Sequence, residues 1–162
     1  MTALPVRIFP LVALALALTG SAAHAADNGS MAVSAVIISK SNCKFNAGAM
    51  ALPFGTIDPA STVNATATAS ATFRCNGSAN PATFFISAGD GLHSTAPGAR
   101  RMQNTTAPAE FMAYALSLTP TTATVPKGQN QTLTVTGTVQ PFEFQNVPAG
   151  AYQDTVVITL TP

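Results

Sequence analysis

The sequence of 162 residues contains little charge, no tryptophan and few other aromatic side chains. Charged residues make up only 8% of it and the formal net charge is +1, so no basic face for nucleic acid or anionic lipid is evident. Hydrophobic residues make up 47%, which argues against intrinsic disorder. A surface with so few charges is poorly protected against self-association. The composition therefore favours a protein that assembles.

A hydrophobic run long enough to cross a membrane is also missing near the N-terminus. The apolar run at residues 8–18 has 11 residues, whereas a spanning helix needs about 20. Arg7 precedes this run, and Ala23 and Ala25 supply small residues before a cleavage site at Ala25–Ala26. These features predict a signal peptide over residues 1–25 and export of the remainder, which suits one domain.

Cysteine and histidine are too scarce for a metal site. Cys43 and Cys75 are the two cysteines, and in an exported protein such a pair predicts a disulfide. The alternative is two free thiols or half of a metal site, but only His93 is left after cleavage and no CxxC pair exists. No motif pairs two acidic residues, and no Gly-rich phosphate loop is present. We therefore expect neither catalysis nor a cofactor.

Short runs with two-residue periodicity, separated by Gly and Pro, fill the chain after the signal peptide. Thr and β-branched residues are common in them, and together they predict an all-β sandwich. The long piece at residues 89–109 is expected to be a loop or a twisted ribbon. The predicted strands cover residues 43–47, 49–55, 62–75, 82–87, 110–118, 131–139 and 152–160.

One further strand-like segment, residues 30–41, precedes the first cysteine. Its side chains alternate: Met31, Val33, Ala35 and Ile37 fall on one face, and Ala32, Ser34, Val36 and Ile38 on the other. No tight turn follows that would fold it back onto its neighbour in sequence. At the other end, the last predicted strand runs to Leu160, where a seven-stranded immunoglobulin-like sandwich would need one more strand.

Several motifs in this order resemble the spore coat protein U domain family, which includes the Csu-type subunits of archaic chaperone–usher pili. The segment after Leu118, TPTTATVPKGQN, departs from the family because it lacks the usual aromatic and Gly-rich features. The motifs that carry the resemblance are FGTIDP at 54–59, FRC at 73–75, ISAGDG at 86–91, ARRM at 99–102, AYALSL at 113–118, VTGTV at 135–139 and VPAGAYQDTVVITLTP at 147–162.

The resemblance implies an incomplete immunoglobulin-like β-sandwich that lacks its final strand. Its groove is expected to hold a strand of a periplasmic chaperone first, and then the N-terminal segment of the next subunit. Residues 26–41 would be that donor segment and residues 42–162 the domain. The implied inserting side chains are Met31, Val33, Ala35 and Ile37, and the implied acceptor strand carries Val156, Ile158 and Leu160.

The function implied is that of a structural subunit of a surface fimbria. It would be exported to the periplasm and assembled with related subunits through an outer-membrane usher, in support of adhesion and biofilm formation. Two other interpretations stay open. Residues 30–41 could be an edge strand of a self-contained secreted coat protein, or the chain could be a tip adhesin or a carbohydrate-binding module. The second is weakened by the lack of Trp for stacking on sugars.

Overall fold

A computed structural model describes residues 31–162 of the chain. The predicted signal peptide, with its cleavage site at Ala25–Ala26, lies outside the described residues. Within residues 31–162, no helix is long and apolar enough to cross a membrane. The chain divides after Ala35 into two units, and every strand found in residues 31–162 belongs to the second, which begins at Val36.

Residues 31–40 form no regular secondary structure, although their sequence alternates like that of a strand. Their large apolar side chains are exposed: 85% of Met31, 84% of Val33 and 85% of Ile37 is accessible to solvent. The first strand begins only at Ser41. A strand is defined by its hydrogen-bonded neighbour, and residues 31–39 have none in the described chain. At Lys40, directly before the first strand, the carbonyl accepts hydrogen bonds from the N–H groups of Ser78 and Ala79.

The largest sheet, sheet A, has four antiparallel strands in the order β1-β2-β8-β6. Its central pair is formed by two long strands that are rich in Thr, Ala and Val, as expected for a sheet with one buried face. The strands are β1 (Ser41–Phe45), β2 (Ala65–Gly77), β8 (Asn130–Val139) and β6 (Ala115–Thr119).

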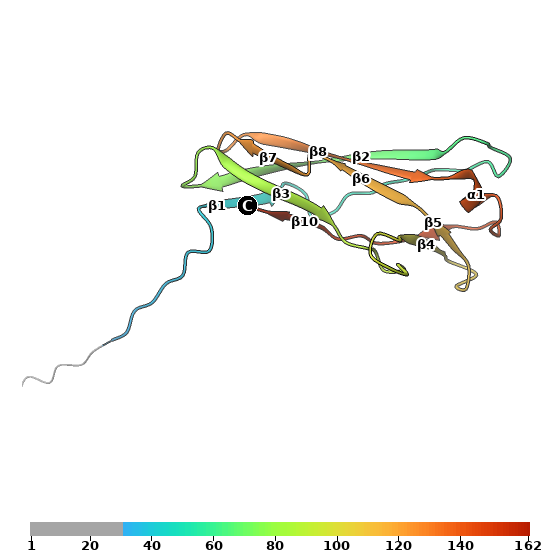
Figure 1. The fold of residues 1–162 in the computed structure, drawn as a ribbon, viewed down its shortest axis with the longest axis horizontal. Helices are drawn as coiled ribbons and strands as arrows, with labels where there is room; N and C mark the ends of the chain where they lie inside the picture. The colour runs from blue at the N-terminus through green and yellow to red at the C-terminus, as the bar shows by residue number, and fades with distance from the viewer. Residues whose placement is uncertain (1–30) are drawn as a thin grey trace, which may run out of the picture. The chain divides into compact units, whose positions relative to one another are not determined.

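Two three-stranded antiparallel sheets complete the fold. Figure 1 labels all of their strands except β9. Sheet B has the order β10-β3-β7 and consists of β3 (Ala82–Ala88), β7 (Thr122–Val125) and β10 (Ile158–Thr161). Sheet C has the order β5-β4-β9 and consists of β4 (Arg101–Asn104), β5 (Phe111–Ala113) and β9 (Tyr152–Gln153). One short helix, α1 (Pro141–Phe144), follows β8.

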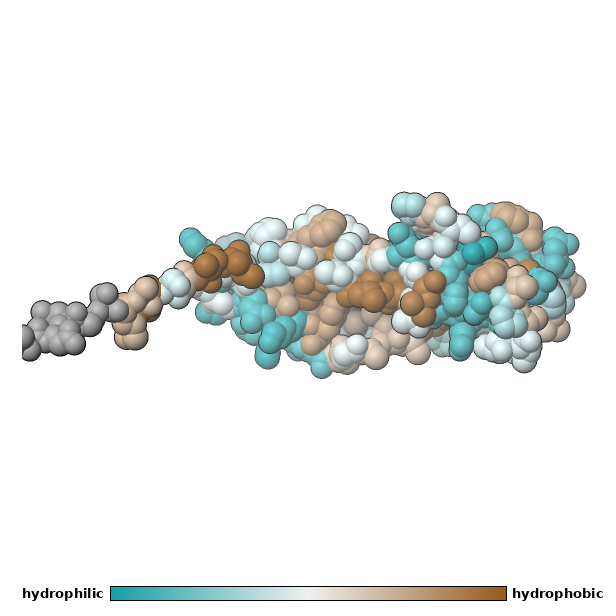
Figure 2. All heavy atoms as spheres, turned by 90° about the horizontal axis from the view of Figure 1, so that it is seen from below, coloured by the Kyte–Doolittle hydropathy of each residue, from teal (hydrophilic) through white to brown (hydrophobic). Residues whose placement is uncertain are grey.

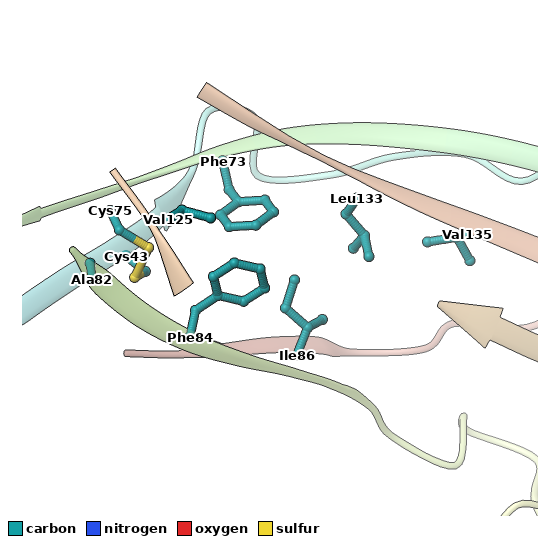
Figure 3. Close-up of a cluster of buried hydrophobic side chains, with 9 residues drawn as sticks. All are labelled: Cys43, Phe73, Cys75, Ala82, Phe84, Ile86, Val125, Leu133 and Val135. Carbon is teal, nitrogen blue, oxygen red and sulfur yellow. A yellow bond between two sulfur atoms is a disulfide. The ribbon is translucent and has the colours of Figure 1, made fainter. Parts of the chain in front are cut away.

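The main core lies between sheets A and B, beside the Cys43–Cys75 disulfide (Figure 3). Phe73 of β2 and Phe84 of β3 meet edge to face, with ring centroids 4.8 Å apart. Leu133 and Val135 of β8 extend this core along sheet A. The disulfide joins residues that lie directly opposite each other in the β1–β2 ladder. The predicted all-β fold is confirmed.

Several predicted elements need correction. Residues 49–55 form no strand, since Pro53 has no N–H to donate to a ladder and Gly55 has a φ of +69°. The predicted strand at 110–118 is two strands, because the chain passes at Tyr114 from sheet C to sheet A. Residues 89–109, expected to be a loop or a twisted ribbon, contain β4, and β7 was not predicted.

The final predicted strand, at residues 152–160, is also divided. It forms β9 in sheet C and β10 in sheet B, and residues 154–157 between them belong to no ladder. Side-chain burial nevertheless alternates throughout, so the backbone stays extended. The break falls at Asp154, whose carboxylate accepts hydrogen bonds from Leu92 and Tyr114.

Candidate functional site: an open groove between two unpaired segments

A groove of about 920 Å³ opens on the unit that carries the strands. Its first side, wall one, is residues 50–59, and its second side, wall two, is residues 147–158. The floor between them is mainly apolar and consists of Met102, Met112, Tyr114, Leu116, Val135 and Phe144. Figure 2 shows apolar atoms gathered midway along the strand-bearing unit.

Wall one packs onto sheet A through Leu52 and Phe54, which are half-buried. Gly137 of β8 makes this close approach possible. A Cβ atom at Gly137 would lie 2.6 Å from Phe54 Cζ and 2.8 Å from Leu52 Cδ2, both closer than real Cβ contacts. The glycine therefore fixes how deeply wall one sits, and with it the width of the groove.

Wall two directs alternate side chains into the groove. Tyr152, Asp154, Val156 and Ile158 are half-buried and line it, whereas the residues between them are exposed. Beyond residue 157 the wall continues as β10, which pairs only with β3 in the described chain. The second edge of β10 is therefore free.

The main chain is largely unpaired in wall one and in residues 154–157 of wall two. No main-chain hydrogen bond joins residues 47–57 to another part of the described chain. Between residues 154 and 157, the Val157 carbonyl accepts a hydrogen bond from the Gly89 N–H, and the four N–H groups make no bond to the main chain of residues 31–162. Unpaired edges of this kind are templates for another strand. An extended segment laid in the groove would find donors and acceptors on both sides.

The groove also opens the hydrophobic core to solvent. Two buried clusters fill the unit, one around Phe73 and one around Met102 and Met112. Each has partly buried members that line the groove: Leu52, Leu116 and Ile158 in the first cluster, and Phe54, Ile57, Tyr114, Val147 and Tyr152 in the second. Apolar surface left open in this way is a hazard for a soluble protein unless something covers it.

A polar pair interrupts the apolar lining. The Tyr114 hydroxyl donates a hydrogen bond of 2.6 Å to Asp154 Oδ2. On its other side, the Tyr114 ring meets the Phe54 ring edge to face, with centroids 6.4 Å apart. Burial raises the pKa of Tyr114 above its usual range, and the Asp154 carboxylate raises it further. Phe54, Tyr114 and Asp154 thus form a continuous bridge from wall one to wall two, which we call the crossbar.

The structure places the three residues of the predicted acceptor strand on the same, half-buried side of the chain. Val156 and Ile158 line the groove, and Ile158 and Leu160 both pack against the core cluster around Phe73. The predicted donor side chains are exposed and outside any sheet. Sequence reasoning missed wall one and Tyr114, although FGTIDP and AYALSL, the motifs that contain them, were among those carrying the resemblance.

Other polar residues singled out in the sequence have structural contacts. Arg100 donates to the carbonyls of Ala88 and Gly89, and Arg101 donates to the carbonyl of His93 while its guanidinium lies 4.2 Å from the centre of the Phe111 ring. Within residues 31–162, no group of three His, Cys, Asp or Glu side chains is placed to hold a metal ion.

Comparison with known families decides which kind of domain this is. The sequence model of the Spore Coat Protein U domain matches residues 27–159, which is most of the chain. The chain belongs to the Spore Coat Protein U domain family. The resemblance drawn from the motifs is thereby confirmed, and the groove is a feature of a Spore Coat Protein U domain.

Solved structures similar to this Spore Coat Protein U domain chain share little sequence with it. One is the CsuC–CsuE chaperone–tip adhesion subunit pre-assembly complex from archaic chaperone–usher Csu pili of Acinetobacter baumannii, with 20% identity and a TM-score of 0.46 over 75% of this chain and 39% of that chain. Another is a chaperone–tip adhesin complex of CFA/I fimbriae biogenesis, with 17% identity and a TM-score of 0.48 over 75% of this chain and 42% of that chain. The chain thus spans about two fifths of the length of these two chains. No curated protein matches the sequence.

Proposed function

We propose that the chain is a structural subunit of a surface pilus that polymerises by donor-strand exchange. The observation that carries the proposal is the groove, in which an apolar floor lies between two extended segments with unpaired main chain. Such a site fits an extended peptide, because the ladder bonds supply affinity and alternate side chains fill the lining. In this proposal the domain is a sandwich that lacks one strand and receives it from another molecule.

The occupant we propose is the N-terminal segment of a second subunit, residues 26–41. Met31, Val33 and Ile37 are almost fully exposed and occupy alternate positions on one face. Burial of each in the groove would contribute roughly 1.5–3 kcal/mol. The donor segment and the groove both expose apolar surface to water, which is unfavourable. Insertion of the segment into the groove of a second subunit would bury both surfaces.

A polymer built this way needs a partner that covers the groove before assembly. We propose that a periplasmic chaperone supplies a strand first and that an outer-membrane usher directs its replacement by the next subunit. Export to the periplasm and display as a cell-surface fimbria follow from that route, and adhesion and biofilm formation are the activities that such a fibre would support. No enzymatic step is part of the proposal.

Co-expression with a periplasmic chaperone of the chaperone–usher class tests the proposal. The full chain should form a one-to-one complex, and after release it should form polymers that survive SDS and separate on heating. A chain with Val33→Ser and Ile37→Ser should still bind the chaperone but form no polymer. The matched control, with Val36→Ser and Ile38→Ser on the opposite face, should polymerise. A stable, soluble monomer of the full chain without any chaperone would support a self-contained domain and reject the proposal.

A further inference from the structure

The apolar lining of the groove belongs to two different hydrophobic clusters, and we call these two parts of the lining its compartments. The compartment on the β10 side is lined by Leu52, Leu116, Val135, Val156 and Ile158. The compartment on the other side is lined by Ile57, Met102, Met112, Phe144, Val147 and Tyr152. Between them, the Tyr114 hydroxyl and the Asp154 carboxylate present polar atoms that a large apolar side chain would desolvate.

We propose that the crossbar sets the register of the inserted strand by accepting only a small side chain above it, and that this side chain is Ala35. The inference rests on the proposed donor-strand exchange and adds which residues meet. The donor face reads Met31, Val33, Ala35, Ile37, so its one small residue lies between large apolar ones. That pattern matches a floor in which a polar bridge separates two apolar compartments.

The opposite face of the donor segment does not match the floor. It reads Ala32, Ser34, Val36, Ile38, with its small residues at one end. With Ser34 above the crossbar, only the methyl group of Ala32 would enter one compartment and leave much of it unfilled. A void among apolar side chains loses packing contacts outright. The Met31 face is therefore the inserting face.

Strand geometry then predicts which donor residue faces which residue of wall two. In wall two, and in the donor segment once it is inserted, every second residue points into the groove. Paired strands advance by the same length per residue. One pair of facing residues therefore determines all the other pairs. Antiparallel pairing is the more stable arrangement per residue. With Ala35 opposite Asp154 in an antiparallel ladder, Val33 lies opposite Val156 and Met31 lies opposite Ile158.

Engineered cysteines in the full chain test this register. Val33→Cys together with Val156→Cys should link successive subunits into a ladder that survives boiling in SDS without reductant. Directly opposite antiparallel cysteines form a disulfide elsewhere in this chain, at Cys43 and Cys75. The matched pair, Val33→Cys with Ile158→Cys, is one step out of register and should link at least tenfold less.

The outcomes separate the two proposals. Polymers in which the Val33–Ile158 pair links better than the Val33–Val156 pair, or in which neither links, overturn the register and leave donor-strand exchange intact. A chain that forms no polymer even without engineered cysteines overturns both.

Size selection at the crossbar is tested without cysteines. Ala35→Leu should slow polymerisation by about tenfold or more, because the larger side chain overpacks the site above Tyr114. Ala32→Leu adds the same atoms on the opposite face and should leave the rate within about twofold. Equal rates for the two variants would show that the crossbar does not select by size.

Discussion

Removal of the Tyr114 hydroxyl should destabilise the domain in a way that depends on pH. In Tyr114→Phe, Asp154 loses the 2.6 Å hydrogen bond to the phenol and keeps the one from the Leu92 N–H, which is 2.9 Å long. A hydrogen bond to a charged group contributes about 1.5–3 kcal/mol. Because the pair lines an open groove, we expect the lower end of that range, about 1.5 kcal/mol at pH 7.

The pH dependence follows from the pKa of Tyr114, which burial and the Asp154 carboxylate raise above the ordinary 10.0. Above pH 10 the unfolded chain loses this proton while the folded chain keeps it, so the contribution of Tyr114 to stability falls as pH rises. One proton corresponds to about 1.4 kcal/mol per pH unit. The advantage of the wild type over Tyr114→Phe should therefore disappear about one unit above pH 10.

Guanidinium unfolding of both proteins at pH 7, 9 and 11 measures this difference. Tyr152→Phe is the matched control, because the Tyr152 hydroxyl donates to the neutral carbonyl of Pro148 at an exposed position. At pH 7, Tyr152→Phe should lower the free energy of unfolding by about 0.5–1 kcal/mol, which is less than the effect of Tyr114→Phe. Equal costs for the two variants, or a Tyr114 advantage that is unchanged at pH 11, would refute the account of the crossbar.

Two other changes test the frame around the groove. Replacing both Cys43 and Cys75 by Ser removes a disulfide between residues 32 positions apart and should lower the free energy of unfolding by about 3–4 kcal/mol. The midpoint of guanidinium unfolding measures this loss, and a loss below about 1 kcal/mol would contradict the prediction. Gly137→Ala should displace Phe54 and cost about 1–3 kcal/mol, whereas Gly48→Ala, with no atom within 4 Å of the added Cβ, should be neutral. Equal melting temperatures for the two glycine variants would show that wall one moves aside freely.

Periodicity in the sequence predicted much of the sandwich. The long strands β2 and β8 alternate strictly, and their burial pattern in the sheet follows that alternation. The cysteine pair predicted the bond that joins β1 to β2. The strands could be predicted from the local alternation of side chains, and the disulfide from the presence of two cysteines in an exported chain. Neither prediction needed the three-dimensional structure.

Wall one and the crossbar could not be predicted from the same patterns. The pattern of residues 49–55 predicted a short strand, but this part of wall one pairs with no other strand, and nothing in its sequence marks it as the side of a groove. The crossbar joins three residues separated by 60 and 40 positions, Phe54, Tyr114 and Asp154, and each looks ordinary in its own segment. Only the crossing of the chain between sheets C and A brings Tyr114 between the other two.

The division of the last predicted strand and the presence of the groove have a common cause at Asp154. The carboxylate holds the backbone at residue 154 toward Tyr114 and Leu92, so residues 154–157 leave sheet C before β10 joins sheet B. A chain that continued as one strand from residue 152 to 160 would lie in a single sheet. Instead, the segment that leaves the sheets is the one whose free N–H groups and half-buried Val156 line the groove. Asp154 therefore positions the wall as well as the crossbar, and loss of its carboxylate should alter both the depth of the groove and the register of its occupant.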